Sequence, residues 1–213
     1  MRIDRAGAPF IAGALIPALL LTFARRPRWA LPLGALAASF AFFFRDPERQ
    51  VPSDADGVIS PADGRVIVAG AAEPSAPAGC WRQVSIFLSP LDVHINRAPV
   101  DGRTTRVEYH PGRFLPAYDA NAAVVNDRNE IWFDHDGEVV VCRQIAGVLA
   151  RRVVCRLAEG DEVRAGDRLG LMKFGSRFDV FLPERADVLV TVGDRVRAGE
   201  TVIARLAGRA NGA

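Results

Sequence analysis

Short apolar runs separated by glycine, proline and aspartate dominate the chain after about residue 45. Runs of this length that are rich in valine and isoleucine and are bounded by turn residues predict β-strands. The predicted strands are residues 57–60, 65–69, 84–88, 105–109, 130–133, 139–142 and 150–155, with a further apolar position at Val100. Amphipathic helical periodicity is scarce in this region. The pattern predicts a mainly β domain, a β-sandwich or barrel, over residues 46–213.

Residues 1–45 have a different pattern, with two apolar runs at residues 6–24 and 29–44 and three arginines between them. A membrane-spanning helix needs about 20 apolar residues, so the first run is long enough and the second is marginal. A signal peptide, a hairpin of two short helices, and one membrane helix with one interfacial helix are the three interpretations. We expect an apolar helical membrane anchor over residues 1–45, because no small-residue cleavage site precedes the arginines.

The apolar stretch at residues 171–183 is interrupted by the dipeptide Gly175-Ser176. Apolar residues on both sides of the dipeptide predict strands. Glycine in such a pattern is typical of a hairpin tip or a bulge. A second interpretation is a site of backbone cleavage, because a serine hydroxyl can attack the sterically open carbonyl of a preceding glycine. The local sequence leaves both interpretations open.

The C-terminal part of the chain carries an internal repeat. The heptapeptide GDEVRAG at residues 160–166 recurs as GDRVRAG at residues 193–199, and each copy predicts a turn, a short strand and a second turn. Two such copies around a central hairpin resemble the β-sandwich of biotinyl and lipoyl carrier domains, which carry a modified lysine between their halves. Lys173, the only lysine, lies between the copies. A membrane-tethered carrier domain modified on Lys173 is therefore an alternative function.

Composition and charge exclude some classes of function. The formal net charge of +2 over 213 residues gives no bulk field for nucleic acid, so we expect no nucleic-acid partner. Cys80, Cys142 and Cys155 show no C-x-x-C spacing and predict reduced thiols. The sequence shows no metal-ligand cluster, and we expect no metal.

Two polar stretches break the β pattern. The first is SPADG at residues 60–64, in which Asp-Gly alone is an ordinary turn signal. The second, residues 89–100, crowds polar and titratable residues after a hydrophobic strand. There His94 alternates with Asp92 and Asn96, so the three side chains share a face if the segment is extended. A polar loop with a hydrogen-bonded histidine is the other interpretation.

Six pieces of sequence occur in one order between about residues 40 and 205. They are Arg45–Pro47, Ser60–Gly64, Leu88–Pro99, Asn126–Asn129, Gln144–Gly147 with Ala150–Arg152, and Phe174–Pro183. Each piece alone is a weak signal, but the ordered set is specific. With these motifs the chain resembles the short bacterial and archaeal form of the phosphatidylserine decarboxylase proenzyme, a pyruvoyl-dependent family.

The resemblance implies a self-cleaving enzyme. The hydroxyl of Ser176 would attack the carbonyl of Gly175, and elimination and hydrolysis would leave a covalent pyruvoyl group in place of Ser176. The products would be a β chain, residues 1–175, and an α chain, residues 176–213, held together as a heterodimer. The pyruvoyl cofactor would form a Schiff base with the amine of phosphatidylserine and accept electrons as carbon dioxide leaves, giving phosphatidylethanolamine.

Self-cleavage needs a base, because the hydroxyl of Ser176 is a weak nucleophile by itself. The resemblance gives this role to His94, with Asp63 as the carboxylate that orients it, in the manner of a Ser–His–Asp triad. The longer relatives carry a second histidine three places later, where this chain has Arg97. Either His94 serves both self-cleavage and decarboxylation, or Asp63 acts more directly.

Arginines are candidates for binding the phosphate or carboxylate of the lipid, since a guanidinium group can bind such groups with two hydrogen bonds. The candidates are Arg97, Arg128, Arg151 and Arg152, and each has a solvated strand charge as its alternative explanation. Because the substrate is a membrane lipid, we expect the protein at the cell membrane, on its cytoplasmic face. A homo-oligomer stays open. A third, non-enzymatic interpretation is a β-barrel scaffold at the membrane.

Overall fold

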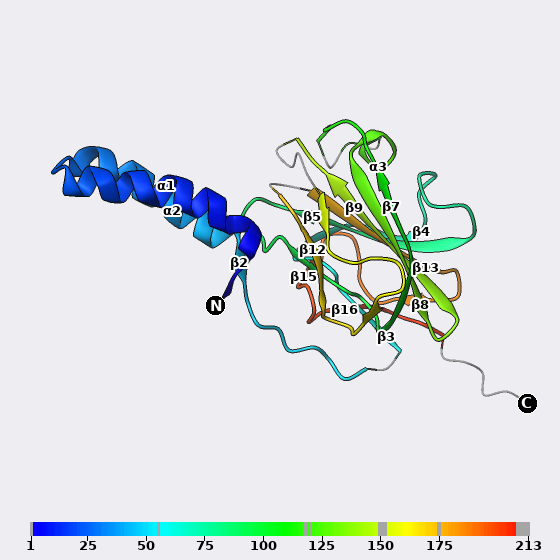
Figure 1. The fold of residues 1–213 in the computed structure, drawn as a ribbon. Helices are drawn as coiled ribbons and strands as arrows, with labels where there is room; N and C mark the ends of the chain where they lie inside the picture. Colours follow the sequence, from blue (N-terminus) through cyan, green and yellow to red (C-terminus); the bar gives the residue numbers. More distant parts are fainter. Residues whose placement is uncertain are drawn as a thin grey trace, which may run out of the picture. The chain divides into compact units, whose positions relative to one another are not determined.

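A computed structural model describes residues 2–54, 56–116, 119, 121–148, 153–173 and 176–207. The chain forms two compact units, residues 1–48 and residues 49–213. In Figure 1 the first unit is the blue helical part of the ribbon, and the strands labelled from β3 onward belong to the second. The helical and β patterns of the sequence therefore correspond to separate units.

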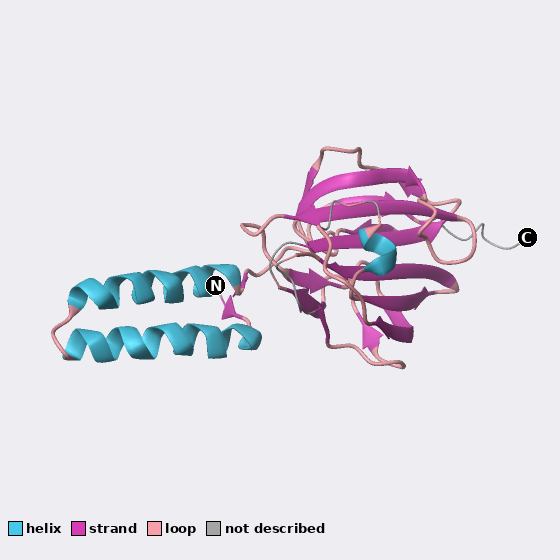
Figure 2. Ribbon diagram, turned by 90° about the horizontal axis from the view of Figure 1, so that it is seen from above, coloured by secondary structure: helices cyan, strands magenta, loops and turns pink. Residues whose placement is uncertain are grey.

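The first unit is a pair of helices that lie side by side (Figure 2). Its elements are β1 (Arg2–Ile3), η1 (Arg5–Gly7), α1 (Ala8–Phe23), α2 (Pro27–Phe43) and β2 (Arg45–Asp46). Phe10 of α1 packs against Phe40 and Phe44, and β1 pairs antiparallel with β2. The structure thus has the helical hairpin that was one interpretation of the N-terminal pattern.

The first helix has the length and composition of a membrane span. The continuous helical segment Arg5–Phe23 has 19 residues and a mean hydropathy of 1.9, and among the described residues it is the one helix that meets both criteria. The second helix, α2, has 17 residues and is shorter than this 19-residue segment. Large apolar side chains of α1, such as Leu20 and Phe23, are exposed. These properties fit association with a membrane.

The second unit consists of strands and one short helix, α3 (Ala122–Val125). The strands are β3 (Gly57–Ile59), β4 (Gly64–Ala71), β5 (Trp81–Leu88), β6 (Ile95–Arg97), β7 (Gly102–His110), β8 (Arg128–His135), β9 (Glu138–Ala146), β10 (Val153–Cys155), β11 (Glu162–Val163), β12 (Arg168–Met172), β13 (Ser176–Pro183), β14 (Asp187–Val188), β15 (Arg195–Val196) and β16 (Val202–Arg205). The longer predicted strands are confirmed. Val100 lies outside the strands, and β6 falls within the polar stretch.

Eight strands form one antiparallel sheet in the order β11-β7-β8-β9-β13-β5-β4-β15, which curls into a half-barrel (Figure 1). Two three-stranded sheets, β10-β12-β6 and β14-β16-β3, complete the unit. The prediction of a mainly β fold is confirmed. The central strand is β13, which pairs with β5 on one side and with β9 on the other.

The two copies of the repeat lie at opposite edges of the large sheet. The strand of the first copy, β11, pairs with β7, and the strand of the second copy, β15, pairs with β4. Gly160 and Gly193 have φ angles of 96° and 102°, in the left-handed region that favours glycine. In the described part of the chain β12 and β13 belong to different sheets and do not pair with each other. They therefore do not form the hairpin that was one of the two interpretations of Gly175-Ser176.

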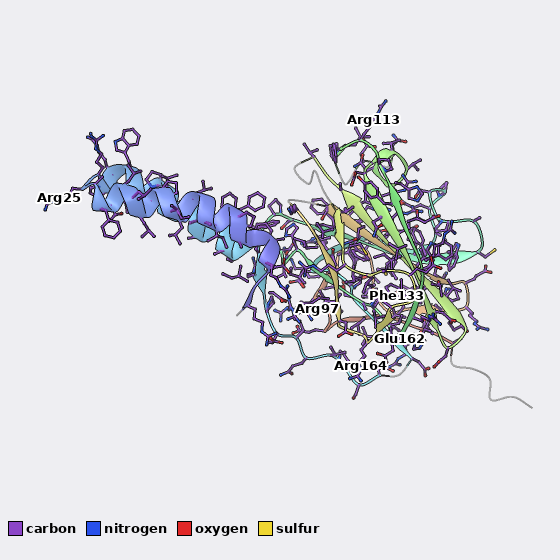
Figure 3. All side chains as sticks on the ribbon, viewed as in Figure 1. Arg25, Arg97, Arg113, Phe133, Glu162 and Arg164 are labelled. Atoms are coloured by element: carbon purple, nitrogen blue, oxygen red, sulfur yellow. The ribbon has the colours of Figure 1, made fainter. Side chains whose placement is uncertain are left out.

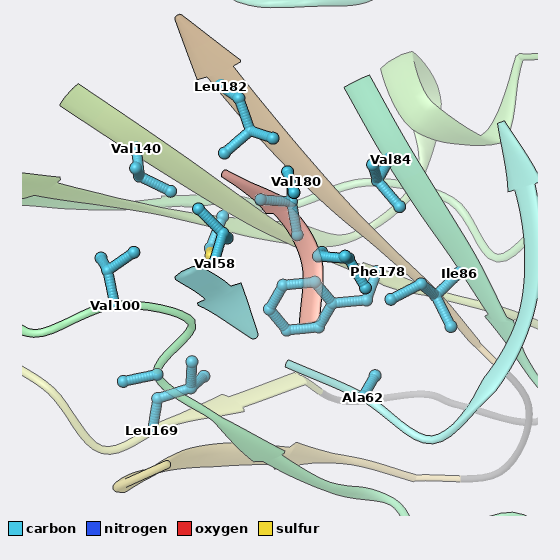
Figure 4. Packing of buried hydrophobic residues seen from close by; sticks show 14 of the residues in the cluster. Val58, Ala62, Val84, Ile86, Val100, Val140, Leu169, Phe178, Val180 and Leu182 are labelled. Carbon is cyan, nitrogen blue, oxygen red and sulfur yellow. The ribbon is translucent and has the colours of Figure 1, made fainter. Parts of the chain in front are cut away.

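The hydrophobic core lies between the inner face of the large sheet and the smaller sheets (Figure 4). Phe178, Val180 and Leu182 of β13 point into it and are fully buried. The side chains that pack against them include Val84, Ile86, Val140, Ala62, Val100 and Leu169. This packing holds β13 in place along its length, since each fully buried side chain of this size contributes about 1.5–3 kcal/mol.

Candidate active site

Ser176 is the first residue of β13 and is fully buried. Its register partners are Leu88, the last residue of β5, and Ala146, the last residue of β9. Alternation along the strand places its side chain on the same face as Phe178, toward the core. Its hydroxyl has no hydrogen-bond partner among the described residues. Since most buried polar atoms are hydrogen-bonded, an unsatisfied buried hydroxyl is a candidate for chemistry.

The bond that the resemblance singles out joins two sheets. Gly175, like Arg151 and Arg152, lies outside the described residues. On one side of it, β12 belongs to a three-stranded sheet, and on the other side Ser176 begins the central strand of the large sheet. The strands on both sides of the bond are therefore fixed by different sheets.

His94 lies beside the strand that leads to Ser176. Strand β6 pairs antiparallel with β12, and the backbone N–H of Met172 donates to the carbonyl of His94 at 3.2 Å. The connection from β5 to β6 thus begins next to Ser176 and ends next to Met172. His94 is itself buried. The topology brings a buried histidine and the buried serine to the same end of the unit.

A backbone carbonyl orients the imidazole of His94. Its Nδ1 lies 2.9 Å from the carbonyl oxygen of Asp92. A carbonyl oxygen only accepts hydrogen bonds, so Nδ1 carries the proton, and in the neutral imidazole Nε2 is the nitrogen that can take one up. His94 can therefore act as a base through Nε2. The carbonyl of Asp92 performs an orienting role that the resemblance assigns to Asp63.

Asp63 lies one strand further along the same end of the large sheet, directly before β4. Its carboxylate accepts from Arg49 Nη2 at 2.8 Å and from the backbone N–H of Ala198 at 2.8 Å. The next residue, Gly64, comes so close to β5 that an added Cβ would lie 2.2 Å from the carbonyl oxygen of Phe87. The Asp-Gly pair therefore fixes a tight strand start, and the described hydrogen bonds of Asp63 go to Arg49 and Ala198.

The two described arginine candidates lie in different places. Arg97 is buried and donates from Nη1 to the carbonyl of Gly166 at 2.8 Å. Arg128, at the start of β8, donates from Nη1 to the carbonyl of Val124 at 2.6 Å. Arg128 lies at the same end of the large sheet as Ser176, because its register partner Ile145 also pairs with Arg177.

A buried ionic cluster lies on the face of β13 that points away from the core. Arg177 donates from Nε to Asp179 at 2.6 Å, and from Nη2 to Glu73 at 2.5 Å and to Ser85 Oγ at 3.1 Å. The side chains of Arg177 and Asp179 are only 3% and 0% exposed. The cluster connects the residue after Ser176 to β5 and to the β4–β5 connection.

Burial and pairing act in opposite directions on this cluster. Burial raises the pKa of Asp179, and Arg177 offsets only part of that rise. Burial would lower the pKa of Arg177, but its pairs with Asp179 and Glu73 raise it overall, so the guanidinium stays charged. Sequence reasoning missed this cluster. The signal for it was the pair of charged residues that alternate within an otherwise apolar strand.

A second missed contact connects the small sheet to the large one. Gln144 Nε2 of β9 donates to Asn96 Oδ1 of β6 at 2.9 Å, and both side chains are fully buried. Asn96 Nδ2 and Gln144 Oε1 have no further partner among the described residues. Because β6 directly follows His94, this amide pair fixes the strand next to the histidine.

One group of three side chains in the described part of the chain could hold a metal ion. The ligand atoms of Glu108, His110 and Glu130 lie within 4.8 Å of one another. Arg106 already pairs with Glu108, and Arg143 pairs with Glu130 at 2.9 Å. These ion pairs compensate the carboxylates without a cation, so the cluster gives no reason to assign a metal.

Comparison with known proteins agrees with the resemblance. A sequence profile described as phosphatidylserine decarboxylase matches residues 36–204. The protein named phosphatidylserine decarboxylase proenzyme from Symbiobacterium thermophilum is 48% identical over 208 residues, which cover 96% of this chain and 95% of the relative. The protein of the same name from Nitrosomonas europaea is 45% identical over 204 residues, which cover 95% of this chain and 94% of the relative.

Proposed function

The chain belongs to the phosphatidylserine decarboxylase family, and on this premise we propose how its own residues make and use the active centre. The enzyme removes the carboxylate of the serine head group of phosphatidylserine as carbon dioxide and leaves phosphatidylethanolamine. The proposal has a proenzyme that cleaves itself between Gly175 and Ser176 into a β chain, residues 1–175, and an α chain, residues 176–213. The matches favour this function over a carrier domain modified on Lys173.

The observation that carries the proposal is the buried hydroxyl of Ser176, which has no hydrogen-bond partner in the described part of the chain. Oγ attacks the carbonyl carbon of Gly175, the amide C–N bond breaks, and an ester bond forms. Loss of the Ser176 Hα then expels the Gly175 carboxylate and leaves dehydroalanine. Its imine tautomer takes up water and releases ammonia, which gives the pyruvoyl ketone. These steps need no external oxidant or reductant.

His94 acts as the base in this proposal. In the neutral imidazole Nε2 is the nitrogen that can take up a proton, because Nδ1 faces the carbonyl of Asp92. It takes the proton of Ser176 Oγ and returns it to the leaving amide nitrogen, as general bases do in acyl transfer. Asp63 remains part of the proposal as a group that supports His94. Its bonds to Arg49 and Ala198 support an indirect role, through the strand start beside β5.

The site fits the pyruvoyl group, since Ser176 supplies it covalently and the strand around it is already rigid. When formed, the group supplies an electrophilic carbonyl that binds the substrate amine and accepts the electron pair released with carbon dioxide. Strands β5 and β9 hold the backbone at position 176 on both sides. The next residue, Arg177, is bound to Asp179. His94 is the group available for the second step as well, because Arg97 stands where the longer relatives have a second histidine.

Arginine side chains are proposed for the phosphate of the lipid. Arg128 is the better placed of the two described candidates, because it lies at the same end of the large sheet as Ser176. Arg97 is buried and bonded to Gly166, which favours a structural role. Arg151 and Arg152 stay candidates on sequence alone.

We further propose that residues 1–45 anchor the enzyme to the cell membrane and that residues 46–213 work on its cytoplasmic face. The apolar helix and the lipid substrate support this arrangement. The likeness of the repeat to biotinyl and lipoyl carrier domains also stays a proposal, supported by the equivalent turns at Gly160 and Gly193.

The mass of the denatured, purified protein tests the proposed function. We expect two chains that separate at Gly175–Ser176, with the smaller one lighter by one ammonia than a chain that begins with serine and resistant to Edman degradation. Ser176→Ala is expected to stay intact and inactive, whereas Lys173→Arg is expected to process normally. An intact wild-type chain, or added mass on Lys173, would contradict the proposal.

A further inference from the structure

Three connections leave the large sheet at the end where Ser176 lies. Strands β5, β7 and β9 finish there, and β8 and β13 begin there, as the register shows: Leu88 and Ala146 face Ser176, and His110 faces Arg128. We name this the Ser176 end of the sheet. These connections are β5–β6, β7–β8 and β9–β10, and a lipid head group that approaches Ser176 from this end of the sheet passes them.

Large apolar side chains on these connections, or on the strand ends next to them, are exposed. They are Leu91, Tyr109, Phe114, Val124 and Val148, and we name them the apolar rim. Leu91 is 72% exposed, although leucine is among the residues most often buried. Exposed apolar groups that gather at one site are typical of an interaction surface.

The two ends of the sheet differ in charge. Arg113 and Arg128 lie at the Ser176 end, and Arg113 projects outward from the unit in Figure 3. A shallow groove at the opposite end is lined by five acidic residues, Asp56, Asp101, Asp134, Asp136 and Glu162, together with Arg103 and His135. This difference in charge between the two ends favours an anionic surface at the Ser176 end. Unlike charges attract each other, and salt screens the attraction only beyond about 10 Å.

We propose that the apolar rim inserts into the interfacial region of a bilayer that contains anionic lipid, so that the Ser176 end of the sheet faces the membrane. Apolar side chains and nearby arginines are the combination that binds such surfaces. The inference rests on the proposed function, because only a lipid substrate requires this approach. It adds a second membrane contact to the one made by the N-terminal anchor.

Phe114 and Val139 allow a matched comparison, because both are 38% exposed but lie at opposite ends of the sheet. The full chain is reconstituted into vesicles of phosphatidylcholine and phosphatidylserine, and decarboxylation is also measured on a soluble short-chain phosphatidylserine. For Phe114→Glu and Leu91→Glu we expect the ratio of the vesicle rate to the soluble rate to fall about tenfold. For Val139→Glu the ratio should stay within about twofold of wild type.

A direct readout uses a fluorophore on Leu91→Cys or Val139→Cys, in a Cys80→Ser background that removes the exposed native thiol. A quencher carried on the lipid chains should quench the probe at 91 and spare the probe at 139. Equal quenching at both positions, or an unchanged rate ratio in Phe114→Glu and Leu91→Glu, would overturn the proposed membrane contact. Failure of the proposed function would look different, since the wild type would then decarboxylate neither substrate.

Discussion

The guanidinium group of Arg177 donates to the carboxylate of Asp179 at 2.6 Å, in a place where both side chains are almost completely shielded from water. Arg177 directly follows Ser176, the residue that self-cleavage would turn into the new chain end. New chain ends generally become mobile unless contacts hold them. The ion pair would therefore keep the catalytic end in place after the proposed cleavage of the bond before it.

Asp179→Asn tests this positioning role. It leaves Arg177 buried with Glu73 as its remaining anion, and loss of one partner of a buried pair costs about 3–5 kcal/mol. We expect Asp179→Asn to cleave more slowly and, once cleaved, to lose kcat about tenfold with little change in KM, because the catalytic end is less well placed.

The control for this variant is Glu108→Gln, which breaks the exposed pair with Arg106. Exposed pairs contribute about 0–1 kcal/mol, so self-cleavage and kcat should both stay close to wild type. Hydrogen exchange at residues 176–180 in the cleaved enzyme gives a second readout. Unaltered exchange in Asp179→Asn would count against the positioning role.

His94→Gln is expected to block self-cleavage. Glutamine fills a similar volume and forms hydrogen bonds, but it cannot take up the proton of Ser176. Removal of a general base typically slows a reaction about 10²–10⁴-fold. The loss of intact chain with time, followed by mass spectrometry from the moment of synthesis, measures this rate. His135→Gln, at the last residue of β8 and the opposite end of the sheet, should process at the wild-type rate. A His94→Gln chain that did so too would exclude His94 as the base.

Asn96→Leu tests the amide pair between the sheets. The change removes the acceptor of Gln144 and leaves a buried amide unsatisfied, which costs about 1–3 kcal/mol. Denaturant unfolding on a Ser176→Ala background, where the chain stays intact, measures that loss. In the chain that keeps Ser176, Asn96→Leu should also slow self-cleavage, since Asn96 fixes the strand that follows His94. The double variant Asn96→Leu/Gln144→Leu should regain part of the stability, and no regain would mean that the pair is not coupled.

Cys142 makes the protein less stable at alkaline pH. Burial raises the pKa of its thiol well above the usual value. The unfolded chain releases this proton above about pH 8.5, whereas the folded chain retains it. The unfolding free energy is therefore fully maintained below that pH and falls above it, by at most about 1.4 kcal/mol per pH unit for one group. Denaturant unfolding of Ser176→Ala and of Ser176→Ala/Cys142→Ala is measured between pH 7.5 and 10. The unfolding free energies of the two variants should converge as the pH rises, and a constant difference between them would contradict the effect.

Local sequence patterns predicted most of the strands, because alternation and turn residues act over a few positions. The runs around Val66, Ile86, Ile131 and Val141 all became strands of the large sheet. Strand β6 was harder to predict, since it has only three residues and two of them, Asn96 and Arg97, are polar. Its polar residues face inward because Gln144 provides a buried partner.

The parts of the site that were missed depend on residues far apart in the sequence. Glu73 and Arg177 meet only because β5 and β13 are neighbours in the sheet. No local pattern predicts that pairing. For the same reason the local sequence left a hairpin of β12 and β13 open as an interpretation, although the two strands belong to different sheets. Asp63 is a different case. The sequence singled out its motif, but not its hydrogen-bond partners Arg49 and Ala198, which are distant along the chain.

The central place of β13 has a consequence for the life of the mature enzyme. Before cleavage, folding is a reaction within one molecule. After the proposed cleavage the segment that supplies β13 to β16 would be a separate polypeptide, so regaining the fold would become an encounter between two solutes whose yield depends on their concentration. A mature enzyme that has once come apart is at a disadvantage that its precursor never had. The lifetime of the active enzyme is then set by the rate at which the two chains separate. Enzyme lost in this way is replaced only by new synthesis.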